Sequence, residues 1–422
     1  MQDHDDIQSV ANGKTLSIYS KTIVFKLICV VIGFVNSILI NRCLGVALRG
    51  EYTTILNWAS LLQLFLNLGI GTTYPAFKRK YPDECKPIFT TIIALMAVIY
   101  LMIIFFLFPS LDSSYRFIAI LALITTIESL LIFIAIVEDV SKRNLINIVT
   151  SVLHTIVLGV IFIFLKFKLS AILGAVIIDH LVFCTTLIVL FQISKIRIHL
   201  INRKIIKEIM IIAIPAMLMN MLMYLNYHAD VLFLSYITKD NYAVGLYGTA
   251  ITLGNMLWII PDAFKDILFN RAAKKDNPEE VIVSIICNFL ICIVVLIGFL
   301  FLGKWFLGIM YGSDFIAAYP LVLMLFIGTL PMVLYKLIHP IYIANGKTKT
   351  VVLLLSIAVA SNFIGNIIII PYLGAMGAAI ASVISYSICG IAFFIKFCKD
   401  FKINFKATLI KVFKLIKRIF DK

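Results

Sequence analysis

Apolar stretches of about 20 residues, separated by short segments rich in charge, Pro or Gly, follow one another along nearly the whole chain. A helix of that length crosses the hydrocarbon core of a bilayer, where every backbone polar group has to be satisfied within the protein. The stretches lack the alternation of apolar and polar residues that is typical of membrane barrels, so we predict helices. About twelve spans are expected, six on each side of a basic segment, near residues 16–41, 52–75, 87–109, 115–138, 144–166, 170–194, 205–236, 243–269, 281–303, 315–344, 350–371 and 373–397.

The composition excludes a water-soluble protein. Hydrophobic residues make up 62% of the chain, charged residues make up 14%, and the mean hydropathy is +1.04. The sequence contains no Walker-type loop for ATP and neither of the motifs GxSxG and HExxH, so we expect no enzyme, no catalytic residue and no cofactor. The 8 cysteines show no metal-ligand spacing, which indicates core residues and no metal site.

The distribution of basic residues predicts the topology. The chain carries 37 Lys and Arg against 22 Asp and Glu, which gives a net charge of +15. When the segments between spans are assigned alternately to the two sides of the membrane, the great majority of basic residues fall on the side of the N-terminus. Because basic residues concentrate on the cytoplasmic side, we predict that both termini are cytoplasmic and that nucleic acid is not a partner.

The basic segments also indicate how the chain divides. We predict a cytoplasmic N-terminal tail at 1–15, a six-helix bundle at 16–194, a basic cytoplasmic linker at 195–204, a second six-helix bundle at 205–397 and a basic amphipathic helix at 398–422. In this last segment lysines alternate with apolar residues at helical spacing. We expect it to lie on anionic lipids of the inner leaflet, with a site for a specific partner as the alternative.

Two short motifs recur about 200 residues apart. Gly50-Glu51-Tyr52 opens the second span and Gly245-Leu246-Tyr247 the eighth, while Leu173-Gly174-Ala175 in the sixth matches Met376-Gly377-Ala378 in the twelfth. Because six spans separate the copies, the repeat preserves direction through the membrane. It predicts an all-α membrane protein of two six-helix bundles, related by a parallel pseudo-two-fold axis around a central cavity. Chance similarity in an apolar sequence is the alternative.

Three of the acidic residues within predicted spans are candidates for a functional site, because a charge there costs about 2.5–3.5 kcal/mol on insertion scales. Glu128 lies near the middle of the fourth span, and Asp179, followed by His180, lies near the middle of the sixth. Asp230 lies toward the outer end of the seventh, on the same face as Asn226. We predict that these three acids line a cavity or couple transport to an ion. The alternatives are interhelical hydrogen bonds for Glu128 and Asp179 and a solvated helix end for Asp230.

Lysines within spans are candidates for binding an anion. Lys26 lies in the first span with Asn36 on roughly the same polar stripe, and Lys265 and Lys336 lie toward the cytoplasmic ends of spans that contain proline. We predict all four as substrate-binding residues, because a diphosphate needs cations and hydrogen-bond donors. The alternatives are snorkelling of Lys26 to the headgroups and ordinary flanking charge for Lys265 and Lys336.

Weak motifs also occur in a characteristic order along the chain. They are Asn41-Arg42-Cys43-Leu44-Gly45 with Arg49-Gly50-Glu51-Tyr52; Asp230 with Val244-Gly245-Leu246-Tyr247, Ala250 and Pro261; and Ile343-Ala344-Asn345-Gly346-Lys347, Asn366, Pro371-Tyr372-Leu373-Gly374 and Gly377-Ala378-Ala379. Together they resemble the polysaccharide and lipid-linked oligosaccharide flippases, O-antigen flippases among them, of the superfamily that also contains the multidrug and toxic compound extruders. The likeness covers nearly the whole chain, and its specificity lies in the order and spacing of the motifs.

The resemblance implies a function. Members translocate an undecaprenyl-diphosphate-linked oligosaccharide, for O-antigen or another surface polysaccharide, from the inner to the outer leaflet of the bacterial cytoplasmic membrane by alternating access. A polysaccharide polymerase and a chain-length regulator are the protein partners that we consider. The alternative function is cation-coupled export of drugs or toxic compounds by the same fold, for which an acid-dominated cavity is expected. A polymerase or ligase is disfavoured by the short outer loops, and a scaffold would leave the mid-membrane charges unexplained.

Overall fold

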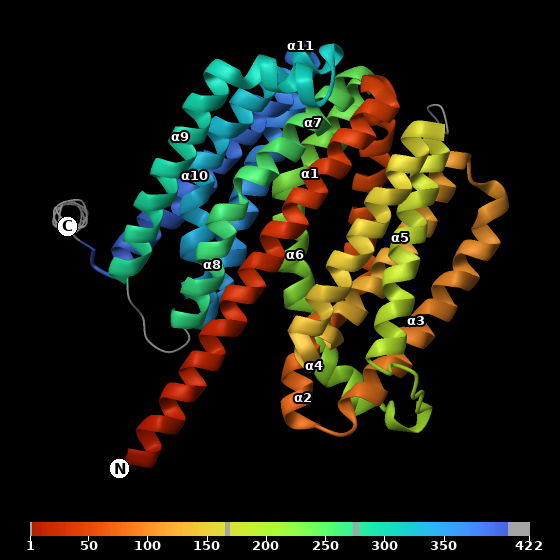
Figure 1. Ribbon diagram of the computed structural model, residues 1–422, viewed down its shortest axis with the longest axis vertical. Coiled ribbons are helices and arrows are strands. Elements are labelled where there is room, and N and C mark those ends of the chain that lie inside the picture. The colour runs from red at the N-terminus through yellow and green to blue at the C-terminus, as the bar shows by residue number, and fades with distance from the viewer. Residues whose placement is uncertain (1, 165–168, 273–277, 404–422) are drawn as a thin grey trace. The chain divides into compact units, whose positions relative to one another are not determined.

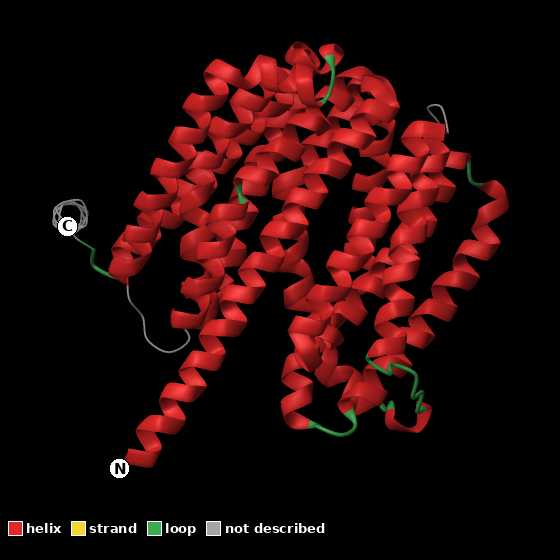
Figure 2. Cartoon of the chain, in the orientation of Figure 1, coloured by secondary structure: helices red, strands yellow, loops and turns green. Residues whose placement is uncertain are grey.

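The computed structural model describes residues 2–164, 169–272 and 278–403, and within these ranges the chain forms helices and turns but no strand (Figures 1 and 2). The α-helices are α1 Gln2–Asn67, α2 Tyr74–Lys80, α3 Cys85–Leu107, α4 Ser113–Phe164, α5 Leu169–Leu190, α6 Arg203–Thr238, α7 Asn241–Leu257, α8 Ile259–Ala272, α9 Pro278–Met310, α10 Tyr319–Ala344 and α11 Thr348–Asp400. Short 3-10 helices occupy Ile70–Thr73, Phe108–Ser110, Ile198–Leu200 and Ser313–Ala318. The predicted all-α class is confirmed.

Nine segments of the described chain are helices long and apolar enough to cross a membrane. Three of them, in α1, α4 and α11, are too long for one crossing: the 53 residues of α11 would extend about 80 Å, against about 30 Å of hydrocarbon. Each contains a non-helical residue, namely Gly45, Asp139 or Gly374, at or within two residues of a predicted gap between spans. Each of the three helices therefore supplies two spans, and the predicted twelve are present.

The three interruptions have local causes. Gly45 has a φ of 66° and Gly374 a φ of 54°, in the left-handed region that favours glycine. Asp139 has an extended backbone, and its carboxylate Oδ1 accepts hydrogen bonds from the backbone N–H groups of Ser141 and Lys142, both at 3.0 Å. Asp139 therefore ends one half of α4 and caps the next.

The described chain folds as two compact units. Unit 1 comprises Met1–Leu44 and Ile55–Met221. Its apolar core joins α3, α4, α5 and the first half of α6, with Phe89, Leu130 and Leu187 almost completely buried. Glu138 of α4 ties this core to α2, because it accepts a hydrogen bond from the Tyr74 hydroxyl at 2.8 Å and pairs with Lys78 at 2.8 Å.

Unit 2 comprises Gly45–Thr54 and Leu222–Lys422. Its most enclosed span is that of α10, of which 67% is buried, compared with 17% for α9. Helix α11 packs closely on α10, and a Cβ on Gly390 would collide with the Pro331 carbonyl. The predicted domain boundaries stay a prediction, and residues 404–422 of the predicted amphipathic helix lie outside the described residues.

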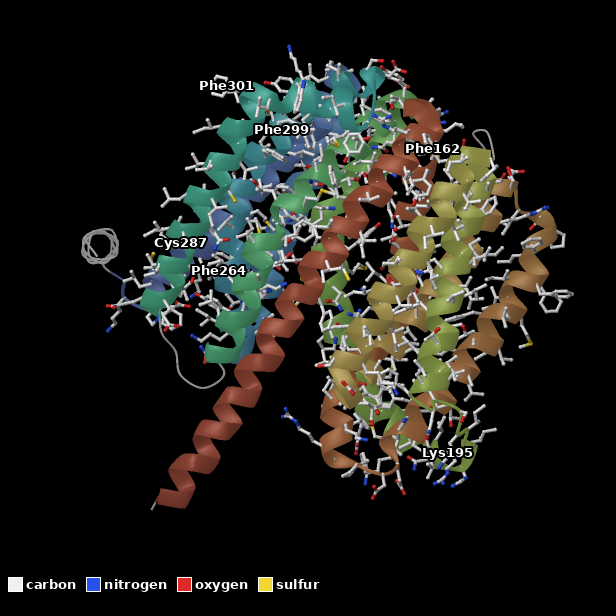
Figure 3. The ribbon with its side chains drawn as sticks, in the orientation of Figure 1. Phe162, Lys195, Phe264, Cys287, Phe299 and Phe301 are labelled. Carbon is white, nitrogen blue, oxygen red and sulfur yellow. The ribbon has the colours of Figure 1, made fainter. Side chains whose placement is uncertain are left out.

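Helices α3 and α9 expose large apolar side chains. Phe105, Phe106 and Phe301 are 76%, 77% and 78% exposed, and Figure 3 shows Phe301 pointing away from the helices. Water would disfavour such surfaces, whereas lipid chains accept them. With the twelve spans, these surfaces identify a multi-pass membrane protein.

The repeated Gly-x-Tyr motifs meet inside unit 2. A Cβ on Gly50 would collide with the backbone carbonyl of Asn241, and a Cβ on Gly245 would collide with that of Val46. The relation is reciprocal, because each glycine lies against the carbonyl of the residue four positions before the other. Glycine permits this close approach of two helix backbones. Such a pair is expected for two copies of one motif related by a two-fold axis.

We predict that Gly245→Ala destabilises the protein by about 1–3 kcal/mol, because a methyl group at this crossing forces the helices apart. Thermal unfolding of the purified protein in detergent would show a lower Tm. Gly298→Ala in α9 is the matched control, since a Cβ there meets no atom within 4 Å. Equal Tm values for the two variants would contradict the close crossing.

Candidate functional site

Three groups of polar side chains join helices within one unit and contain residues that the sequence predicts as site residues. We call them the Glu128–His180 pair of unit 1 and the Asp230 and Lys336 clusters of unit 2. Within the described residues, no group of three or more His, Cys, Asp and Glu has the geometry to hold a metal ion.

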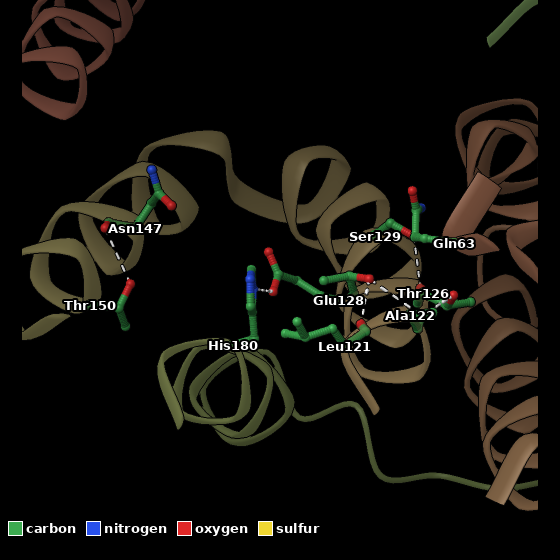
Figure 4. Close-up of polar contacts among 10 residues, drawn as sticks. Gln63, Leu121, Ala122, Thr126, Glu128, Ser129, Asn147, Thr150 and His180 are labelled. Atoms are coloured by element: carbon green, nitrogen blue, oxygen red, sulfur yellow. Dashed lines mark hydrogen bonds and ion pairs between the residues drawn. The ribbon is translucent and has the colours of Figure 1, made fainter. Parts of the chain in front are cut away.

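The Glu128–His180 pair joins α4 to α5. Figure 4 shows the two side chains facing each other, with Nδ1 of His180 2.5 Å from Oε2 of Glu128. The next residue of α4, Ser129, accepts a hydrogen bond from Nε2 of Gln63 in α1 at 3.1 Å. One turn of α4 therefore presents polar groups to two neighbouring helices. A histidine that shares a proton with a carboxylate can gain or release that proton.

Three further residues of unit 1 were predicted as site residues, namely Asp179, Asn36 and Lys26. Asp179 is half-buried next to His180 in α5. Asn36 of α1 accepts a hydrogen bond from Oγ1 of Thr155 in α4 at 2.7 Å, so its carbonyl oxygen contributes to helix packing. The side chain of Lys26 lies outside those that the structure describes.

The Asp230 cluster joins α6, α7 and α11. Asp230 is 1% exposed, so the alternative of a solvated helix end is wrong. Its Oδ2 accepts hydrogen bonds from the Tyr247 hydroxyl and, at 2.6 Å, from the Ser382 hydroxyl, while Oδ1 accepts one from the backbone N–H of Val231 at 2.8 Å. These donors are all uncharged. Tyr247 belongs to the second Gly-x-Tyr motif, so the close helix crossing at Gly245 places the Tyr247 hydroxyl beside the Asp230 carboxylate.

Asparagines extend the Asp230 cluster along α6 and α11. Ser385 donates a hydrogen bond to Oδ1 of Asn226 at 2.7 Å, and Asn366 donates one to Oδ1 of Asn362 at 2.8 Å. Buried polar atoms of these amides remain without a hydrogen-bond partner: Nδ2 of Asn226, Nδ2 of Asn362 and Oδ1 of Asn366. This row of buried polar groups has unpaired hydrogen-bond donors and acceptors, which a water molecule or a small ion could contact.

The Lys336 cluster joins α8 to α10. The ammonium of Lys336 lies 2.9 Å and 3.0 Å from the two carboxylate oxygens of Asp262. Lys265, one turn further along α8, lies 3.2 Å from Oδ1 of the same carboxylate. The Lys336 side chain is 8% exposed, compared with 38% for Asp262 and 31% for Lys265. Two predicted cations therefore share one acid, and Lys336 is the most enclosed of the three groups.

Aromatic rings enclose the buried lysine of this cluster. The Lys336 ammonium lies 4.6 Å from the ring centroid of Trp258 and 5.7 Å from that of Tyr227. Tyr386 packs edge-on against both rings. The rings stabilise the cation by cation–π attraction.

The sequence alone did not single out several members of these clusters. Asp262 follows Pro261 and precedes Lys265 by three residues, and this helical ion-pair spacing was a usable signal. Tyr247 was noted only as part of a repeat. Ser382 carried no signal, because a serine in an apolar helix is common and its partner is distant in sequence.

These observations define a class: twelve spans in two helical units, with charged side chains inside the spans, identify a polytopic membrane protein. The chain matches the model of a family described as "Polysaccharide biosynthesis protein" over residues 19–261, more than half of its length. The chain belongs to this polysaccharide biosynthesis protein family. A comparison with curated protein sequences finds no match.

Solved structures share the fold. The lipid II flippase MurJ, in an inward closed conformation, superposes with a TM-score of 0.71 at 16% identity, covering 95% of this chain and 92% of that one. An inward-facing multidrug resistance MATE family transporter of the MOP superfamily gives 0.65 at 14% identity, covering 92% and 96%. An outward-facing MATE transporter gives 0.59 at 15% identity, covering 94% and 95%. The predicted resemblance to this superfamily is confirmed.

We predict that Ser382→Ala destabilises the protein by about 1–3 kcal/mol, because the buried Asp230 carboxylate loses a hydrogen-bond donor. The control is Ser356→Ala on the same helix, since the Ser356 hydroxyl donates only to the carbonyl of Val352 in the turn before it. Thermal unfolding in one detergent compares them. An unchanged Tm for Ser382→Ala would show that Asp230 does not depend on this bond.

Proposed function

We propose that this protein translocates an undecaprenyl-diphosphate-linked oligosaccharide, the repeat unit of O-antigen or another surface polysaccharide, from the inner to the outer leaflet by alternating access. It is a transporter rather than an enzyme. The observation that supports this most directly is the Lys336 cluster, in which two lysines converge on one anionic group inside an apolar helix unit. Membership in the polysaccharide biosynthesis family and the fold shared with MurJ support the lipid-linked substrate.

The chemistry of the proposed substrate matches this cluster. A diphosphate that joins a sugar to a polyprenol carries two negative charges, and the ammonium groups of Lys265 and Lys336 are both within reach of one bound anion. Polar amide and hydroxyl groups suit the sugars, whereas the polyprenyl chain is as apolar as lipid and can remain in it. Lys26 and Asn36 stay predicted contributors to this site.

The cellular setting follows from the proposed substrate and the charge distribution. The protein would lie in the bacterial cytoplasmic membrane with both termini cytoplasmic, and anionic lipids of the inner leaflet are proposed as partners. A polysaccharide polymerase would use the delivered repeat units, with a chain-length regulator acting on the polymer. These partners are part of the proposal.

A second candidate function is cation-coupled export of a drug or toxic compound. It is favoured by the Asp230 cluster, because a fully buried carboxylate with only neutral donors is a good site for a proton or a small cation. The two functions differ in which cluster meets the transported molecule. In the flippase, Asp230, Glu128 and Asp179 would serve ion coupling while the lysines bind the substrate.

The driving force of the flippase need not involve an ion. Moving about two negative charges outward across about 100 mV, inside negative, contributes about 5 kcal/mol in the required direction. Ion coupling through Glu128, Asp179 or Asp230 would add to this.

Deletion of the gene in the native host is expected to abolish surface polysaccharide, with the lipid-linked repeat unit accumulating on the cytoplasmic leaflet. Complementation with Lys336→Gln should lower display at least about tenfold, because a charge-assisted hydrogen bond contributes about 1.5–3 kcal/mol. Lys396→Gln is the control, since Lys396 also pairs with an aspartate, Asp400, at 2.7 Å, but at the end of α11. Normal display after deletion, or a repeat unit already on the outer leaflet, would contradict the flippase function.

We predict that Glu128→Gln flattens the dependence of polysaccharide display on external pH, because glutamine removes the carboxylate that faces the titratable His180. Asp179→Asn and Asp230→Asn test the other two acids in the same assay. Glu84→Gln, at an exposed position outside the spans, serves as the control. Display that is unchanged at every pH would remove the substituted acid from the mechanism.

A further inference from the structure

A groove on unit 1 lies between α2 and the first half of α6 and has a volume of about 290 Å³. Its lining residues are Ala76, Phe77 and Lys80 of α2 and Glu208, Ile211 and Ile212 of α6. The Lys80 ammonium lies 2.8 Å from Oε2 of Glu208, so these two residues form a charged end. Because the other four residues lie about one helical turn away along each helix, the opposite end of the groove is apolar.

The apolar end of the groove presents side chains that the core of unit 1 does not use. Ile209 and Ala213 of α6 are buried in that core, whereas Ile211 and Ile212, on another face of the helix, are 63% and 42% exposed. A hydrocarbon chain that lay along the groove would cover these two side chains.

Both helices place the charged end of the groove at one boundary of the membrane. Runs without Asp, Glu, Lys or Arg occupy residues 52–77 and 209–229, and each run ends beside the Lys80–Glu208 ion pair. A run of about 20 such residues crosses the hydrocarbon. The ion pair therefore lies at the level of the lipid headgroups, and the two isoleucines lie about 5 Å deeper, at the edge of the hydrocarbon.

The surroundings of the charged end are positive. In the segments 78–86 and 203–208 the basic residues Lys78, Arg79, Lys80, Lys86, Arg203, Lys204 and Lys207 outnumber the acids Asp83, Glu84 and Glu208. The Lys80 side chain is 56% exposed, compared with 25% for Glu208, which also accepts a hydrogen bond from the Tyr81 hydroxyl at 3.3 Å. The exposed ammonium of Lys80 is thus available to a negatively charged headgroup.

We propose that this groove binds one anionic phospholipid from the leaflet on the basic side of the protein. Its phosphodiester contacts Lys80, and the first part of an acyl chain lies along Ile211 and Ile212. This occupant matches both ends of the groove. A free phosphate would leave the isoleucines uncovered, and a zwitterionic lipid would gain less from the excess of positive charge. The site belongs to unit 1 and does not depend on which molecule the protein transports.

Binding of single lipids to the full-length protein in a neutral detergent, measured by native mass spectrometry, tests the proposal. The probes are dioleoyl phosphatidylglycerol, which is anionic, and dioleoyl phosphatidylcholine, which is zwitterionic. The wild-type protein should bind the first phosphatidylglycerol more tightly than the first phosphatidylcholine. Lys80→Gln should weaken this phosphatidylglycerol binding about fivefold, which is the effect of one basic residue near a membrane surface.

Lys304→Gln is the matched control for Lys80→Gln. Lys304 lies over the Tyr319 ring at 5.4 Å, much as Lys80 lies over the Tyr81 ring at 5.1 Å, but it belongs to α9 in unit 2. Its substitution should leave the affinity for the first phosphatidylglycerol unchanged.

The apolar end has a test of its own. Ile211→Ala should weaken phosphatidylglycerol binding about fourfold, which corresponds to the loss of about one buried methylene group. Ile297→Ala serves as its control, because Ile297 is 50% exposed on α9, away from the groove.

Glu208→Gln distinguishes a lipid site from an ion pair that only ties α2 to α6. If the pair were only a tie, Lys80→Gln and Glu208→Gln would disturb the groove alike and change lipid binding in the same direction. In the lipid site Glu208 opposes the phosphodiester, so Glu208→Gln should strengthen phosphatidylglycerol binding while Lys80→Gln weakens it. Equal Tm values without lipid would show that both variants fold.

A competition with the wild-type protein separates a lipid from a free phosphate and needs no substitution. Ammonium phosphate should displace no more phosphatidylglycerol than ammonium acetate of equal ionic strength does. Specific displacement by phosphate, together with an unchanged affinity in Ile211→Ala, would identify a free-phosphate site and overturn the proposal. Equal affinities for the two lipids, or wild-type affinity in Lys80→Gln, would overturn it as well. A loss of phosphatidylglycerol affinity in Lys80→Gln and Ile211→Ala, but in neither control, supports the lipid site.

Discussion

The constraint on which this structure depends is that a charged or polar group inside a lipid-embedded helix unit needs a partner from the protein. No water is at hand in hydrocarbon to compensate a carboxylate or an ammonium, so each such group remains only where other helices supply the compensation. The buried charges therefore mark the places where helices meet. Glu128 pairs with His180 between α4 and α5, Asp230 takes donors from α7 and α11, and Lys336 reaches across from α10 to α8.

The two clusters of unit 2 differ in the groups that surround the buried charge. Asp230 is surrounded by neutral hydroxyl and amide groups, which leave its charge unbalanced and suit a proton or small cation. Lys336 pairs with a carboxylate that is more exposed than the lysine itself. The proposed function assigns the anionic substrate to the Lys336 cluster and a coupling ion to the Asp230 cluster.

Close backbone contact puts the side chains of these clusters within reach of each other. The reciprocal contact of Gly50 and Gly245 brings α7 against the segment that follows the bend in α1, and Tyr247, two residues after Gly245, reaches Asp230. Similarly, Gly390 allows α11 to approach α10 at Pro331, five residues before Lys336. Small residues at crossings are therefore as important to the candidate sites as the charged residues themselves.

The sequence by itself determined the membrane class, the number of spans and the family resemblance, because hydrophobic length, helix-breaking residues and their order are properties of the chain in one dimension. It also identified Glu128, Asp230, Lys265 and Lys336, since a charge in an apolar run is conspicuous without a structure. Only the tertiary structure decided which partner each of them has. His180 rather than Asp179 faces Glu128, Asp262 joins the two lysines, and Ser382 reaches Asp230 from 152 residues away. Apolar helices carry little information about their neighbours, because any apolar face packs acceptably on any other, and the partners are set by the packing of whole helices in three dimensions.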